Sequence, residues 1–128
     1  MRIAAWWLYA AASWLLVAGL FVQVFLAGLG VFDSPERFEI HRNVGYTLEL
    51  LPLVMVLAGL VGRLGLRYVG LAALIFGLFI VQSILIALRG QTPAIAALHP
   101  VNGFVILLLA IVVARQAVRS ARPSPATA

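Results

Sequence analysis

The sequence predicts an all-α integral membrane protein, a bundle of four transmembrane helices. Mean hydropathy is +1.11, and 64% of the 128 residues are hydrophobic while only 10% are charged. A bilayer core about 30 Å thick is crossed by roughly 20 apolar helical residues, and four stretches of the chain are long enough. Runs this continuous suit helices rather than the alternating strands of a membrane barrel.

The helices follow one another with short connections in a single domain over residues 1–119. The first is long enough to tilt in the membrane, and its apolar run exceeds the roughly 7–15 residues of a signal peptide, so we expect an uncleaved span. Residues 120–128 are rich in proline and small residues, which predicts a disordered cytoplasmic tail. The four predicted helices cover about residues 3–31, 35–61, 68–88 and 93–119.

Two helix starts have the same signature. Ser34 and Thr92 are predicted N-caps, and each precedes a proline, which is favoured at the first helical position. Pro100 allows two interpretations of the last helix. Either it kinks the helix by freeing the carbonyl four residues back, or the membrane-embedded helix begins at Pro100 with His99 at its cap.

The distribution of charge predicts the orientation. The net charge is +5, and all nine basic residues are arginines. In a four-span arrangement most of them fall on the side of the termini, which the positive-inside rule places in the cytoplasm. This pattern indicates membrane lipid rather than nucleic acid as the partner of the positive charge, and the lack of lysine is typical of a GC-rich bacterial genome. We expect a multi-pass protein of the bacterial plasma (inner) membrane with both termini inside.

An internal repeat contains the only two histidines. Ser34-Pro35 is followed by His41 and Gly45, and Thr92-Pro93 is followed at the same spacings by His99 and Gly103. We therefore predict two repeated helical hairpins related by a pseudo-two-fold axis along the membrane normal. Such an axis makes the histidines symmetry mates.

Each of the four helices brings a polar side chain to a similar depth. Gln23 and Gln82 lie near the ends of the first and third helices, and the histidines lie near the starts of the second and fourth. At 1.5 Å per residue these side chains share a slab in the outer third of the bilayer. Polar groups at such depth usually face the bundle interior and mark function.

These residues are consistent with one haem b held by two axial imidazoles. Alternate helices of a four-helix bundle can supply His41 and His99 from opposite faces of the ring. Glycine at 45 and 103, one turn deeper on nearly the same face, leaves room for the macrocycle. The predicted supporting residues are arginines for the propionates and amides as second ligand shell: Arg37, Arg42, Arg89, Gln23, Gln82, Asn43 and Asn102.

Other interpretations of the histidines remain open. Each is consistent with an interfacial residue bonded to backbone or water, or with a chlorophyll ligand. A zinc or copper site needs three or four ligands, and only Glu39 is near, on a different helix face from His41. The absence of cysteine excludes thiolate sites.

Glu49 and several glycines complete the candidates. Glu49 lies near the middle of the bilayer, three residues before Pro52, where an ionised carboxylate is costly. It is either a proton relay or quinone contact, or a protonated side chain bonded to a carbonyl that Pro52 frees. The glycines are interpreted as close-packing residues: Gly59, Gly62, Gly70 and Gly77.

The segment Glu39–Asn43 on the second helix, together with Leu98-His99 on the fourth, resembles one half of heme A synthase and, more loosely, four-helix cytochrome b membrane proteins. The resemblance implies haem held by histidines of the second and fourth helices near the outer face. The chain also resembles small four-span bacterial membrane proteins of unknown function, which share a glutamine in the first helix, His-Arg-x-x-Gly-Tyr and a late Leu-His-Pro.

We therefore expect an electron-transfer protein rather than a stand-alone enzyme, because the chain is half the length of a heme A synthase and has one histidine pair. Its partners are expected to be a quinol, a larger redox complex, or further copies of the chain. Two alternatives are a cofactor-free accessory subunit of a respiratory or photosynthetic complex, and a quinone- or lipid-binding protein that uses Glu49.

Overall fold

A computed structural model describes residues 1–122 and confirms the four long apolar helices. Each is long and apolar enough to cross a membrane, which makes this a multi-pass membrane protein. The candidate spans are Arg2–Phe32, Pro35–Val61, Leu66–Gly90 and Pro93–Ala121. The first is a single helix, α1, and the other three are interrupted.

The interruptions divide these spans into shorter elements. The second span contains a 3-10 turn η1 (Pro35–Arg37), α2 (Phe38–Leu48) and α3 (Leu50–Val61). The third consists of α4 (Leu66–Ala87) and the 3-10 turn η2 (Leu88–Gly90). The fourth consists of α5 (Pro93–Ala96) and α6 (Leu98–Ala121).

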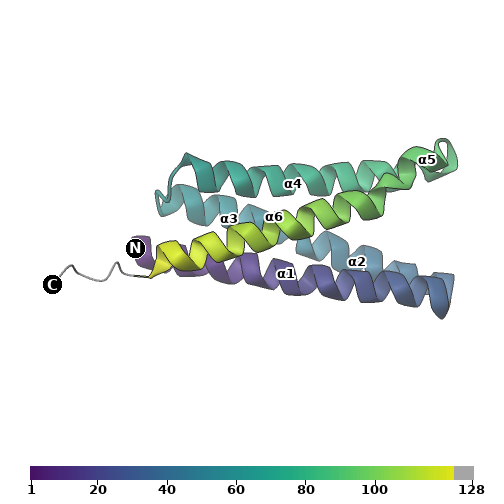
Figure 1. Cartoon of the computed structure of the whole chain (residues 1–128), viewed down its shortest axis with the longest axis horizontal. Coiled ribbons are helices and arrows are strands. Elements are labelled where there is room, and N and C mark those ends of the chain that lie inside the picture. Colours follow the sequence, from purple (N-terminus) through teal and green to yellow (C-terminus); the bar gives the residue numbers. More distant parts are fainter. Residues whose placement is uncertain (123–128) are drawn as a thin grey trace.

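The four spans surround one core in chain order, because α1 packs against α3 and α6, and α4 packs against the same two helices. The N-terminus and the end of α6 lie at one end of the bundle, and α2 and α5 lie at the other (Figure 1). We call these the terminal end and the histidine end, since α2 and the start of α6 carry the two histidines.

Two breaks have the same physical cause. Pro52 has no N–H for the carbonyl of Leu48, and α2 ends at Leu48. Pro100 has no N–H for the carbonyl of Ala96, and α5 ends at Ala96. Pro100 therefore does not kink a helix interior. It lies in the first turn of α6, where backbone N–H groups have no intrahelical partner in any case.

The predicted helix starts and the predicted tail have different outcomes. Ser34 and Thr92 do precede the elements that begin at Pro35 and Pro93, although neither makes a side-chain capping bond. The start of the predicted tail is wrong, because α6 continues to Ala121. The remainder of that tail, from residue 123, lies outside the described residues.

The apolar core is concentrated toward the terminal end. Nearly all its members come from the first two thirds of α1, from α3, from the first two thirds of α4 and from the later part of α6. Toward the histidine end α2 packs on α1, but no Cα atom of α2 lies within 8 Å of a Cα atom of α4 or α6. The break at Glu49 thus separates a tightly packed part of the bundle from a part in which α2 stands apart from α4 and α6.

The predicted close-packing role holds for two of the four glycines. A Cβ at Gly59 would lie 2.9 Å from Cγ2 of Val69, and a Cβ at Gly62 would collide with the Cβ of Ala5. Gly70 and Gly77 have no heavy atom within 4 Å of such a Cβ, so that interpretation is wrong for them. In α6 the close packing is made by alanines, which are fully buried: Ala110, Ala114 and Ala117.

Candidate functional site

The structure brings His41 and His99 together. One projects from α2 and the other from the first turn of α6, and their ring centroids are 6.2 Å apart with planes inclined at 59°. The backbones of α2 and α6 stay more than 8 Å apart, so the side chains alone approach each other across the space between these helices.

Each imidazole is held by a hydrogen bond to a backbone carbonyl. His41 Nδ1 is 3.0 Å from the carbonyl oxygen of Gln23, and His99 Nδ1 is 3.2 Å from that of Gln82. A carbonyl only accepts, so in both rings Nδ1 carries the hydrogen and donates it. A neutral ring then keeps its lone pair on Nε2, which is the arrangement of a metal-ligating histidine whose other nitrogen is bonded to a carbonyl.

The two glycines face the glutamine amides. A Cβ at Gly45 would lie 2.8 Å from Nε2 of Gln23, and a Cβ at Gly103 would lie 3.4 Å from Nε2 of Gln82. Each glycine therefore leaves room for the glutamine amide of the helix beside it. The same glutamine accepts the hydrogen bond of the histidine through its backbone carbonyl. The glutamines thus contribute twice, through the carbonyl that holds the imidazole and through the amide that covers the glycine.

The two amides differ in their bonding. Asn102 Nδ2 donates to Gln82 Oε1 at 2.7 Å and to the carbonyl of Leu78 at 2.9 Å. At the corresponding place in the other hairpin the residue is Val44, which has no donor. Oε1 of Gln23 is buried and has no hydrogen-bond partner among the described residues.

This difference predicts unequal effects for one substitution made at two sites. Gln82→Leu removes the acceptor of Asn102 and is expected to lower the free energy of unfolding by about 1 kcal/mol. Gln23→Leu removes an oxygen that has no hydrogen-bond partner among the described residues. Because burying an unsatisfied polar atom is itself costly, this variant should lower the free energy of unfolding less than Gln82→Leu, or not at all. Thermal unfolding of both variants in the same detergent compares them. Equal losses would show that Gln23 Oε1 has a partner after all.

Most of the predicted supporting residues lie outside this cluster. Arg42 and Asn43 are exposed on α2, and Arg89 is exposed in η2. Arg42 lies 3.9 Å from the carboxylate of Glu39. Among the predicted amides, the structure therefore brings Gln23, Gln82 and Asn102 to the histidines, and Asn43 faces away.

Charged groups at this end also pair locally. Arg37 Nε donates to Asp33 Oδ2 at 2.8 Å, with both side chains about half exposed. Such an exposed pair contributes little to stability. Glu49 is half-buried at the junction of α2 and α3, and its role as a proton relay or quinone contact stays a prediction.

One aromatic contact of the site was missed. The ring of Phe38 meets that of His41 edge to face at 6.3 Å and packs over Gly30, where a Cβ would lie 2.7 Å from the Phe38 ring. The spacing of three residues places Phe38 and His41 on one helix face, and this signal was available in the sequence. The two carbonyl partners of the histidines gave no such signal, because every residue has a carbonyl.

The donor set limits the chemistry of the site. Among residues 1–122 no group of three or more His, Asp or Glu side chains is placed to hold a metal ion. A tetrahedral zinc site needs more protein ligands than two imidazoles supply. Two neutral imidazoles facing one another suit a cofactor that brings its own equatorial ligands and needs two axial ones.

Fold and site together define a multi-pass α-helical membrane protein with a paired-histidine site near one end of its bundle. Residues 23–89 match the family described as Family of unknown function (DUF6220), and the chain belongs to this family. No curated protein and no solved structure matches the chain. The comparisons give no link to heme A synthase or to cytochromes b.

Proposed function

We propose that the protein binds one haem b between His41 and His99 and transfers electrons in the membrane. The observation that carries the proposal is the pair of facing imidazoles, 6.2 Å apart between centroids, each with Nδ1 bonded to a carbonyl and Nε2 left as the ligand atom. Spacing, protonation and surroundings support it separately.

The spacing fits two imidazoles on one metal atom. A metal–nitrogen bond is about 2 Å long, and the nitrogen lies about 1 Å from the centre of its own ring. Two imidazoles on opposite sides of the metal therefore have centroids about 6 Å apart. Two histidines in direct hydrogen-bonded contact through their ring nitrogens would lie closer, since a hydrogen bond spans only about 3 Å.

The hydrogen bonds orient both ligands before a cofactor arrives. Because each bond is made within one hairpin, between α1 and α2 or between α4 and α6, each ring has a fixed tautomer. An Nδ1–H bonded to a carbonyl also raises the basicity of the other nitrogen as a ligand. Pre-organised ligands lower the entropy cost of binding.

The surroundings of the pair provide further possible partners. No Cα atom of α2 lies within 8 Å of a Cα atom of α4 or α6, so the helices that carry the two histidines are not in backbone contact at this depth. The unpaired Oε1 of Gln23 is an acceptor with no partner in the described chain. Exposed Arg42 and Arg89 at the same end are our proposed partners for the haem propionates.

Two filled axial positions favour electron transfer over oxygen binding. A haem near one face does not connect both sides of the bilayer, so the proposal includes a redox partner: a quinol, a larger complex, or a second copy of the chain. We further propose that the hairpins are structural repeats, in agreement with their matching histidine bonds, and that both termini lie in the cytoplasm of a bacterium.

An optical spectrum tests the proposal. Purified protein supplied with haem b and reduced with dithionite should show the sharp α-band of low-spin, six-coordinate haem, at one haem per chain. A reduced spectrum without that band, or haem retained only as in empty detergent micelles, would reject the proposal. A cofactor-free accessory subunit would then be the better interpretation.

A further inference from the structure

The terminal end of the bundle is positive and has no acidic residue near it. Every arginine other than Arg37, Arg42 and Arg89 lies there, at the start of α1, in the α3–α4 connection, in the first turn of α4, or in the last turns and C-cap of α6. The acidic residues of the whole chain are at positions 33, 36, 39 and 49, all outside this end. Its charge is therefore not neutralised by any Asp or Glu side chain, and an anionic partner is favoured.

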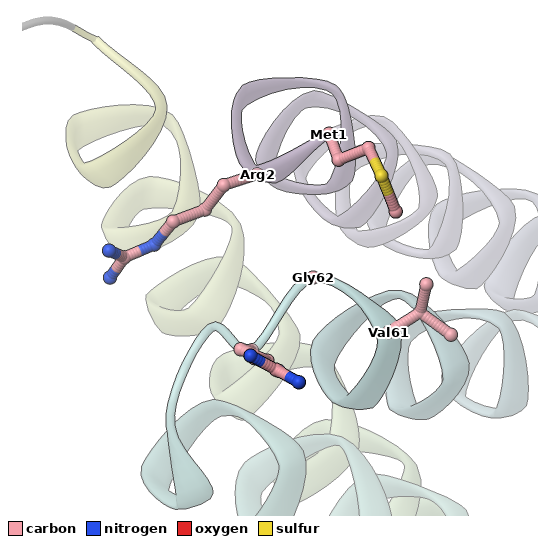
Figure 2. A pocket seen from close by; sticks show the side chains of 5 residues that line it. Met1, Arg2, Val61 and Gly62 are labelled. Carbon is pink, nitrogen blue, oxygen red and sulfur yellow. The ribbon is translucent and has the colours of Figure 1, made fainter.

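A pocket of about 520 Å³ opens within this positive region. It is lined by Met1, Arg2, Val61, Gly62 and Arg63. Figure 2 shows Met1 and Val61 on one side of Gly62 and the Arg2 side chain on the other. Because Gly62 has no Cβ, the end of α3 approaches Ala5 of α1 closely, and this approach brings both arginines to one pocket.

Arg63 occupies a backbone position that usually belongs to glycine. The N–H of Leu64 bonds the carbonyl of Gly59, and the N–H of Arg63 bonds that of Leu60, which together form a Schellman motif after α3. The residue in the left-handed conformation of this motif is Arg63, with φ 49°. Apart from asparagine and aspartate, residues with a Cβ rarely adopt this conformation and are strained there. A side chain kept at such a cost points to a role.

Arg63 also borders a second, smaller pocket of about 200 Å³. The rest of its lining is aliphatic or glycine: Gly59, Leu60, Gly65, Leu66 and Val69. Leu60 and Leu66 are exposed, as expected for side chains in contact with acyl chains. Arg63 therefore lies between a pocket with a second arginine and a pocket whose other lining residues are all aliphatic or glycine.

We propose that these two pockets form a binding site for one anionic phospholipid. Its headgroup phosphate accepts hydrogen bonds from the guanidinium groups of Arg2 and Arg63, and one acyl chain lies over Leu60, Leu66 and Val69. The apolar second pocket favours a phospholipid over a soluble phosphate. This site is separate from the histidine pair and does not depend on haem binding.

The left-handed position of Arg63 provides a direct test. Arg63→Gly removes the guanidinium and relieves the backbone strain, so the fold should be kept and its melting temperature unchanged or higher. We expect at least a tenfold loss of affinity for phosphatidylglycerol, measured by native mass spectrometry of delipidated protein. Arg63→Asn, which also tolerates the left-handed conformation, should show the same loss. Arg67→Gln is the matched control, because Arg67 bonds Gln116 and lines neither pocket.

The outcomes separate the sources of binding. Phosphatidylcholine, with no net charge, should bind at least tenfold more weakly than phosphatidylglycerol, and millimolar glycerol phosphate should not displace the lipid. Displacement by glycerol phosphate would overturn the lipid assignment in favour of a soluble anion. Equal losses in Arg63→Gly and Arg67→Gln, or none in either, would show that no specific site exists.

Discussion

His41→Ala and His99→Ala should each abolish the low-spin haem spectrum of the reconstituted protein. Each variant removes one of the two proposed axial ligands, and no other imidazole exists in the chain to replace it. We expect the sharp α-band to disappear and haem affinity to fall by at least about 100-fold, because changes in the second shell alone commonly cost 10- to 100-fold. Haem titration followed by absorbance measures both quantities.

Two controls distinguish lost ligation from lost folding. Added imidazole should restore part of the low-spin spectrum in either variant, because a small ligand can fill the vacated axial position only if the bundle is intact. Asn43→Ala, on the same helix as His41 but facing away from the pair, should bind haem as the unmodified protein does. An α-band that persists in either histidine variant would mean that another residue ligates the iron.

Ala114→Leu should cause the largest loss of stability of any single change considered. Ala114 is completely buried in the core at the terminal end, and its neighbours on the same face of α6 are also alanines. Added methylene groups in a closely packed core typically cost 1–3 kcal/mol and occasionally more. Helix pairs in membranes are especially sensitive to an added side chain. No hydrophobic driving force brings helices together in lipid, so their association depends on close packing of the backbones. We expect a clearly lowered melting temperature in detergent, or failure to fold.

The same substitution at Ala73 is the matched control. Ala73 is exposed on α4, where a leucine would contact lipid or detergent, so Ala73→Leu should leave the melting temperature nearly unchanged. A similar loss in both variants would mean that helix propensity rather than packing decides stability at these positions.

The fold class was predictable because a single physical requirement dominates it. Backbone groups in lipid must be bonded within a helix, and four apolar runs of sufficient length leave little choice. The same reasoning did not find the break after Leu48, although Pro52 and its missing N–H were visible. Whether a proline bends, breaks or merely begins a helix depends on how neighbouring helices pack, and both Pro52 and Pro100 lie in the first turn of the helix that follows a break.

The site was predictable in part. Equal spacing of His41 and His99 after two proline-initiated helices indicated that the two rings share one depth, and the structure brings their centroids to 6.2 Å from each other. The roles of Gln23 and Gln82 were only partly visible, since their carbonyls rather than their amides hold the rings. Asn102, three residues after His99, shares its helix face, whereas Asn43, two residues after His41, lies on another face, so the spacing in the sequence already distinguished them.

Packing between helices was the least predictable. Glycine is the usual signal for close approach in membranes, yet Gly70 and Gly77 face open space while alanines of α6 make the contacts. Small side chains are common in lipid-exposed positions too, so composition alone does not tell which helix face is inside.

The hydrogen bonds that hold the imidazoles have a mechanical consequence. Each ring is anchored inside its own hairpin, so a displacement of one hairpin against the other would leave both hydrogen bonds in place and change the distance and angle between the rings. The packing of α1 on α6 and of α3 on α4 joins the two hairpins, so these helix pairs set the distance and the angle between the two rings.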